Sequence, residues 1–200
     1  MNLKSIFISI LLLIAFSCQQ KKECCKKDAN SETQSKSALS DESIYQLTSD
    51  WKKQDGTTIK LESMRGKIVV AAMVFTNCAS ACPRIVADIQ RIEKEVNSND
   101  VHFLLISMDP EKDTPERFRE FAKERGIGDQ WTMISSVQSS TDEIANVLGV
   151  KIKKLSDGGF DHSNSIYVLD VDGSIAHIQE GLEQEPTQAI AKIKELIAKM

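Results

Sequence analysis

Residues 68–75 have the sequence IVVAAMVF, an apolar run without a charged or polar side chain. A short continuous run of this kind, rich in β-branched residues, is typical of a strand that is covered on both faces of a sheet. The run leads into TNCASACP at residues 76–83, after which apolar residues recur at helical spacing: Ile85, Val86, Ile89, Ile92 and Val96. We therefore expect a central strand, a short loop that contains two cysteines, and then a helix.

Weaker signals on both sides of this unit complete the fold. Further strands are expected at residues 44–47 and 57–61 around an Asp55-Gly56 turn, at 101–108 and 131–134, and at 165–171 and 174–178 around Asp172-Gly173. Further helices are expected at 114–126, with Thr114 as N-cap and Pro115 at the first position, at 141–148 and at 187–199. This order, βαβ then ββα, predicts an α/β thioredoxin-like fold with an N-terminal β-hairpin and an inserted helix.

The first 17 residues have the pattern of a secretory signal. Lys4 precedes an apolar run at 6–16, and Ser17-Cys18 follows it. The run is shorter than the roughly 20 residues that a spanning helix needs. A cysteine directly after the small residue indicates a bacterial lipoprotein that is cleaved before Cys18 and acylated there, and an ordinary signal with a stray cysteine is the alternative. We expect an exported protein of the bacterial cell envelope, lipid-anchored to the membrane and facing the periplasm.

Residues 18–43 are predicted to be the acylated cysteine and a disordered tether, followed by one folded domain at 44–200. The tether is rich in Lys, Glu, Ser, Gln and Asp and has too few apolar residues to form a core. Cys24 and Cys25 lie within it. A second metal site or redox pair, extra acylation and idle thiols all remain open for these two, and we assign them no role.

The charge and the cysteine count exclude some classes of protein. The chain has a net charge of −4, and removal of residues 1–17, which contain Lys4 and no acid, leaves −5. A mildly acidic chain without a basic patch argues against a nucleic-acid partner. The thiols are too few for a disulfide scaffold, so we interpret them as local chemistry. We expect the protein to be a monomer.

Cys78 and Cys82 lie between the central strand and the next helix, where ligands bind in open α/β sheets. Pro83 suits a first helical turn, which places Cys82 near the N-cap, where the helix dipole stabilises a thiolate. The spacing of four brings both sulfurs to one side of the turn, within reach of one ion or of each other. Two unreactive buried cysteines are the alternative.

His162 is the third candidate. It follows Gly158-Gly159-Phe160-Asp161 in a predicted flexible loop that the topology brings toward the cysteines, and Asp161 could accept a hydrogen bond that fixes the tautomer. Two thiolates and an imidazole suit Cu(I), and an added ligand would allow Cu(II). Zinc with an open coordination position is not excluded by residue type. His102 and His177 fall within predicted strands and are expected to be structural.

Three motifs resemble those of the Sco/SenC family. TNCASACP at 76–83 is similar to its T-x-C-x-x-x-C-P motif, SMDPEKDTP at 107–115 to its S-V-D-P-x-x-D-T-P stretch, and Asp161-His162 to its D-H pair. The resemblance covers about residues 51–200. It implies a copper chaperone whose ligands are Cys78, Cys82 and His162. It also implies a role in delivering copper to the dinuclear copper site of cytochrome c oxidase, or in reducing that site's cysteines.

The chain also departs from that pattern. Ala79-Ser80-Ala81 stand where family members commonly carry Pro and Asp, which affects affinity and redox potential rather than the ligand set. Asp109 and Asp113 are interpreted as a turn residue and a helix-start residue.

Three other functions compete with the chaperone. A thiol–disulfide oxidoreductase usually has C-x-x-C and a cis-proline before the hairpin strand, but the prolines here are Pro83, Pro110, Pro115 and Pro186. A peroxiredoxin-like peroxidase would need a P-x-x-x-T/S-x-x-C approach, which is absent. An inert surface lipoprotein is the third. We expect a binding protein rather than an enzyme, with thiol–disulfide exchange as the one activity left open.

Overall fold

The structure, a computed structural model, describes residues 39–200. The predicted signal peptide, the lipidation site Cys18, the pair Cys24-Cys25 and most of the predicted tether lie outside this part. Among the described residues, no helix has the length and apolar character that a membrane crossing requires.

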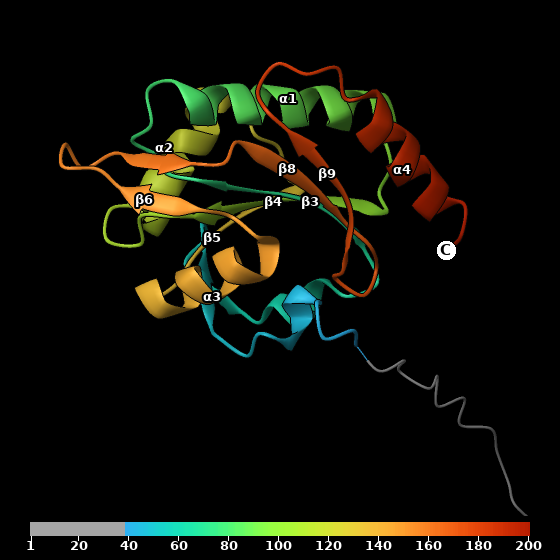
Figure 1. The fold of residues 1–200 in the computed structure, drawn as a ribbon, viewed down its shortest axis with the longest axis horizontal. Coiled ribbons are helices and arrows are strands. Elements are labelled where there is room, and N and C mark those ends of the chain that lie inside the picture. Colours follow the sequence, from blue (N-terminus) through green and yellow to red (C-terminus); the bar gives the residue numbers. More distant parts are fainter. Residues whose placement is uncertain (1–38) are drawn as a thin grey trace, which may run out of the picture. The chain divides into compact units, whose positions relative to one another are not determined.

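A mixed sheet forms the centre of the domain (Figure 1). Its strand order is β2-β1-β5-β4-β3-β8-β9. The bounds are β1 Trp51–Lys53, β2 Thr58–Ile59, β3 Ile68–Val74, β4 Val101–Ser107, β5 Trp131–Ser135, β8 Ser165–Leu169 and β9 Ile175–Glu180. Strand β3 is parallel to β4 and antiparallel to β8, and every one of its residues is buried. The apolar run at residues 68–75 therefore contains the covered central strand that its composition predicted.

Helices cover both faces of this sheet. The bounds are α1 Ala81–Val96, α2 Pro115–Arg125, α3 Gln138–Leu148 and α4 Thr187–Ile197. In Figure 1, α1 and α4 lie over one face and α3 over the other. The Gln90 amide of α1 donates to the Arg125 carbonyl at the end of α2, 2.8 Å away, so these two helices are neighbours. The order β3-α1-β4 and then β8-β9-α4 confirms the predicted thioredoxin-like fold.

Helix α2 has the capping residues that the sequence predicted. Thr114 has extended backbone angles, and its side chain accepts a hydrogen bond from the backbone N–H of Arg117. Pro115 occupies the first turn, where its missing N–H costs nothing. Gly126 ends the helix at φ +63°, a left-handed conformation that glycine adopts without steric penalty.

The predicted strand at residues 44–47 is wrong. Ile44–Gln46 form a short 3-10 helix, η1, and the first strand of the N-terminal hairpin is Trp51–Lys53. Ser43 is the physical reason, because its side chain accepts a hydrogen bond from the Tyr45 N–H and starts a helical turn. A second 3-10 helix, η2, spans Leu61–Met64, where the sequence had placed the end of a strand.

Two further differences concern the second half of the chain. Helix α3 begins at Gln138, three residues before the predicted start at Thr141. A second hairpin, made of β6 (Ile152–Lys154) and β7 (Phe160–His162), was not predicted. His162 therefore belongs to a hydrogen-bonded strand and not to a flexible loop.

The beginning of the described chain packs on the β8–β9 turn. The Ser43 hydroxyl donates to the Asp172 carbonyl, and the Ile44 N–H donates to the Gly173 carbonyl at 3.1 Å. The Tyr45 ring lies directly on Gly173, so close that an added Cβ atom would stand 2.7 Å from a ring carbon. Gly173 also has φ +80°. This position therefore needs glycine for two separate reasons.

Gly173→Ala is expected to destabilise the domain more than Gly126→Ala. Both substitutions incur left-handed strain of about 1–2 kcal/mol, but nothing lies within 4 Å of a Cβ at Gly126. The clash with Tyr45 should add about 1–3 kcal/mol at Gly173. Urea unfolding of the two variants beside the wild type measures the difference. Equal losses of unfolding free energy would show that Tyr45 moves aside at no cost.

Candidate metal centre

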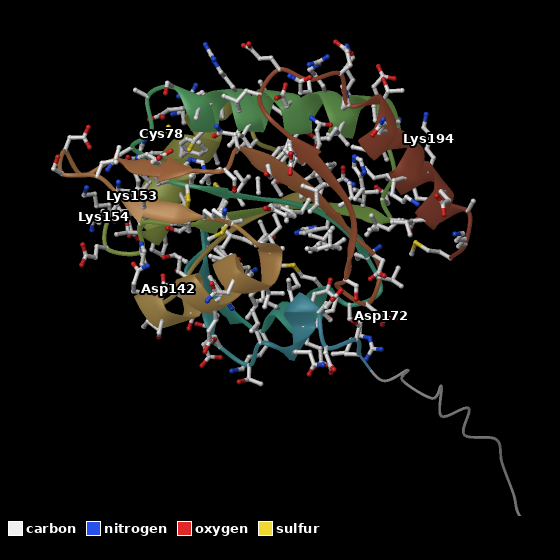
Figure 2. The ribbon with its side chains drawn as sticks, viewed as in Figure 1. Cys78, Asp142, Lys153, Lys154, Asp172 and Lys194 are labelled. Atoms are coloured by element: carbon white, nitrogen blue, oxygen red, sulfur yellow. The ribbon has the colours of Figure 1, made fainter. Side chains whose placement is uncertain are left out.

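The two cysteines lie where β3 ends and α1 begins. The Cys78 N–H donates to the Phe75 carbonyl at 3.1 Å, which turns the chain sharply after the strand. Helix α1 starts at Ala81, so Cys82 lies in its first turn, as predicted. The Cys82 N–H points back at the Cys78 sulfur, 3.4 Å away. Figure 2 shows Cys78 at this end of α1.

The two thiols differ in exposure and in acidity. Cys78 is partly exposed and Cys82 is fully buried. Burial acts to raise the pKa of Cys78. Hydrogen bonds act more strongly in the other direction, so the net pKa is below the ordinary value; they come from the backbone N–H groups of Cys82, Ser80 and Ala81 and from the Cys82 thiol. Burial raises the pKa of Cys82, and the nearby charges of Cys78 and Asp113 add to this. Cys78 is therefore the thiol that ionises first.

A cavity of about 580 Å³ opens in front of Cys78. Its walls come from the loop after β3, from Lys112, and from the β6–β7 hairpin with its turn. Cys78 and His162 both line this cavity, whereas Cys82 is fully buried and does not line it. The fold thus brings residues more than eighty positions apart in the sequence to one opening.

The imidazole of His162 is held in one orientation. Its ring packs edge-on against Phe75, with centroids 6.3 Å apart, and Phe160 packs on the same phenyl ring at 5.0 Å. Its Nδ1 lies 2.9 Å from the Ser163 carbonyl oxygen, which can only accept, so Nδ1 carries the proton and Nε2 keeps its lone pair. Burial lowers the pKa of His162, and the Ser163 contact and the Asp161 charge offset part of this. A neutral ring with a free Nε2 is the form that binds metals.

Two of the three candidate ligands line one cavity and the third, Cys82, is buried beside Cys78, so the three do not form a closed site. Within residues 39–200, no group of three His, Cys, Asp or Glu side chains lies close enough to hold a metal ion. The cysteines are neighbours through the contact between Cys82 N–H and Cys78 Sγ. Asp161 is exposed next to His162 and reaches the ring through its charge. Joint ligation would require the three side chains to come closer together than they are here.

The other histidines lie elsewhere. His102 is on β4, and its Nε2 is 2.8 Å from the Thr132 hydroxyl of β5. His177 lies in β9, the last strand of the sheet. Neither residue lines the cavity at Cys78.

The sequence underestimated Asp113. It does precede the N-cap Thr114, as interpreted, but its carboxylate is fully buried and accepts hydrogen bonds from Thr76 and Ser107. Thr76 follows β3, 37 residues earlier in the chain. The only sequence signal for this contact is that Thr76 and Asp113 belong to two of the motifs that resemble the Sco/SenC family.

Comparison with known families follows these motifs. A sequence model of the SCO1/SenC family matches residues 37–198. The chain belongs to the SCO1/SenC family. A relative, the SCO1 protein homolog of Bacillus subtilis, is 30% identical over 142 residues, which cover 68% of this chain and 74% of that protein.

Solved structures of SCO1/SenC proteins have the same fold. A SCO1/SenC family lipoprotein from Bacillus anthracis is 25% identical with a TM-score of 0.69, over 74% of this chain and 92% of that one. Arabidopsis thaliana ScoI, solved with copper bound, has a TM-score of 0.67 over 76% of this chain and 96% of that one. At 20% identity, the second similarity supports the thioredoxin-like fold alone.

Brief treatment with iodoacetamide at neutral pH is expected to modify Cys78 at least about tenfold faster than Cys82, because only the thiolate reacts and only Cys78 is accessible. Peptide mass spectrometry resolves both sites from the other cysteines. In urea-unfolded protein the two rates should become similar, since both thiols then have ordinary pKa values. Faster labelling of Cys82 in the folded protein would contradict the assigned asymmetry.

Proposed function

We propose that this chain binds copper, as Cu(I), through Cys78, Cys82 and His162, and takes part in assembling the dinuclear copper site of cytochrome c oxidase. The observation that carries the proposal is a cavity lined by the acidic thiol of Cys78 and by a neutral imidazole, with Cys82 buried directly beside Cys78. The copper bound in A. thaliana ScoI supports the same choice of metal.

The donor set fits a soft, low-coordinate metal. Thiolates prefer Cu(I), and imidazole accepts it as well. Cys78 is the first ligand, because its pKa is lowered and it faces the cavity. Cys82 must lose a proton that burial makes it retain, so copper binding would release protons and weaken as the solution becomes acidic. Copper is the cargo here, and an open cavity suits its transfer to an acceptor.

The cellular setting follows from the part of the chain before residue 39. We infer a lipoprotein signal at 1–17, an acylated Cys18 with a tether through residue 43, and the folded domain at 44–200. The B. anthracis relative, which is a lipoprotein, supports this setting. The domain would act as a monomer, anchored by lipid in the cell envelope and facing the periplasm, with a cytochrome c oxidase subunit as its copper acceptor.

A second function uses the same thiols without copper. An exposed acidic Cys78 beside a buried Cys82 is suited to dithiol–disulfide exchange. The Cys78 thiolate would attack an acceptor disulfide and displace one acceptor sulfur. Cys82 would then lose its proton and attack Cys78, which releases the second sulfur. The acceptor ends reduced by two electrons, and this chain ends with a Cys78–Cys82 disulfide.

Copper retention tests the first function. Purified full-length protein in detergent, reduced and loaded anaerobically with Cu(I), is expected to retain one copper per chain against a competing chelator. Cys78→Ser and Cys82→Ser should lose affinity by about 100-fold or more, and His162→Ala by about 10-fold or more. His177→Ala, a histidine away from the cavity, is the matched control and should keep the wild-type value.

The competing functions give different results in this experiment. Full copper retention in both cysteine variants would contradict the copper proposal. Reduction of a disulfide substrate by protein that does not retain copper would support dithiol exchange in its place. A fall in copper affinity from neutral to acidic pH is also expected, and an affinity that stays flat would contradict thiolate ligation.

A further inference from the structure

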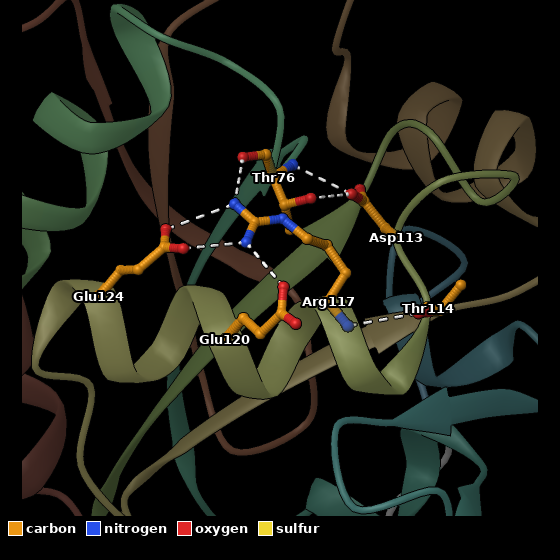
Figure 3. Close-up of polar contacts among 6 residues, drawn as sticks. All are labelled: Thr76, Asp113, Thr114, Arg117, Glu120 and Glu124. Atoms are coloured by element: carbon orange, nitrogen blue, oxygen red, sulfur yellow. Dashed lines mark hydrogen bonds and ion pairs between the residues drawn. The ribbon is translucent and has the colours of Figure 1, made fainter.

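A buried carboxylate lies behind the cysteine loop. Asp113 is 1% exposed and accepts three hydrogen bonds, of which Figure 3 shows the two from Thr76. Its Oδ1 accepts from the Thr76 N–H at 3.0 Å and from the Thr76 hydroxyl at 2.6 Å, and its Oδ2 accepts from the Ser107 hydroxyl at 2.6 Å. Burial raises the pKa of Asp113, and the hydrogen bonds from Ser107 and Thr76 oppose this, because three donors suit the ionised carboxylate.

Arg117 also holds Thr76, through its carbonyl group. Its Nη2 donates to the Thr76 carbonyl at 3.2 Å. The guanidinium is fixed in turn by Glu124, at 3.0 Å, and by Glu120, at 3.3 Å (Figure 3). The N–H, carbonyl and hydroxyl of Thr76 are therefore all bonded to residues at the start of α2. We call the residues Thr76, Asp113 and Arg117 the Thr76 clamp.

The Thr76 clamp lies next to the backbone groups of Phe75 that contact the two cysteines. The residue before Thr76 is Phe75, whose N–H points at the Cys82 sulfur, 3.5 Å away, and whose carbonyl accepts from the Cys78 N–H. Cys78 follows two residues after Thr76. The Phe75 carbonyl and the Thr76 N–H belong to one peptide plane, so a rotation of this plane would move the carbonyl that holds Cys78, next to the N–H that contacts the Cys82 sulfur.

The side chains between the cysteines offer little restraint of their own. Ala79 and Ala81 have no polar side-chain atoms, and Ser80 makes no capping hydrogen bond to α1. On the strand side, Thr76 adds side-chain and backbone hydrogen bonds that hold this turn. A buried, charge-assisted set of hydrogen bonds is stronger and more directional than exposed ones, so it can fix the geometry of the turn.

We propose that Asp113 and Arg117 are positioning residues, which hold the Thr76 peptide and thereby set the relative position of the Cys78 and Cys82 sulfurs. This rests on the proposed function, in which these two thiols do the work. Asp113 also lies near enough to Cys82 for its charge to act on that thiol. The clamp would thus tune how easily the two sulfurs form a disulfide or share an ion.

The test uses copper-free, full-length protein, so it does not depend on whether copper binds. The two readouts are the equilibrium between the Cys78–Cys82 dithiol and disulfide in a glutathione redox buffer, and the alkylation rate of Cys78 at fixed pH. Thr76→Val keeps the shape of the side chain and removes its hydroxyl, and Asp113→Asn removes the charge. Both are expected to shift the equilibrium constant at least about tenfold, or about 30 mV, and to change the alkylation rate of Cys78.

Two control variants separate positioning from stability. Thr76→Ser keeps the hydroxyl, so its dithiol equilibrium constant and Cys78 alkylation rate should stay within about twofold of the wild type. Asp88→Asn removes another buried carboxylate, 3% exposed and bonded to the Glu183 N–H at 2.8 Å, that does not touch Thr76. It should lower the unfolding free energy and leave the dithiol equilibrium unchanged.

The outcomes are distinct. If folded Thr76→Val matches the wild type in both readouts, the positioning role is overturned, whether or not Asp113→Asn folds. An equal shift in Asp88→Asn would also overturn it, because the effect would then follow stability. Loss of the copper proposal alone would leave these results intact, since no metal is present in the measurement.

Discussion

All seven residues of β3 are buried, and the strand is paired with β4 along one edge and with β8 along the other. Burying a Val or Ile side chain stabilises the fold by about 1.5–3 kcal/mol, so neither the register nor the end of this strand can move cheaply. A shift of one residue would exchange the faces that its side chains occupy. The place where Phe75 and Thr76 leave the sheet is therefore fixed by the core, and the geometry of the cysteine loop depends on it.

From that fixed point, one short turn makes two unlike thiols out of the same residue type. Cys82 enters the helix and points into the core beside the Phe75 N–H, and Cys78 stays outside, where backbone N–H groups converge on its sulfur. The helix start stabilises negative charge on the outer thiol, and burial opposes it on the inner one. The asymmetry suits either ordered metal binding or ordered thiol exchange, because in both cases one sulfur must react before the other.

Sequence patterns located the parts whose signals are local. The apolar run of β3 and the caps of α2 depend on neighbouring residues, and both were predicted. The strand predicted at residues 44–47 was wrong because Ser43 can start a helical turn, which an apolar pattern does not reveal. The β6–β7 hairpin was missed because its strands are three residues long and one of them is largely lysine. The Thr76–Asp113 contact joins residues 37 positions apart, and nothing local announces it.

The Thr76–Asp113 contact matters because of the residues between the cysteines, Ala79-Ser80-Ala81. Where the SCO1/SenC family commonly carries Pro and Asp between the cysteines, the loop itself would supply stiffness and charge. Here neither is present in the loop, yet Cys78 still needs a defined position if its sulfur is to meet an ion or Cys82. The buried carboxylate of Asp113 provides both from outside the loop, through the Thr76 peptide and through its charge near Cys82. The cavity side of Cys78 is thereby left clear of restraining groups. A site held from behind and open in front can admit an ion or a partner thiol without unfolding its own support.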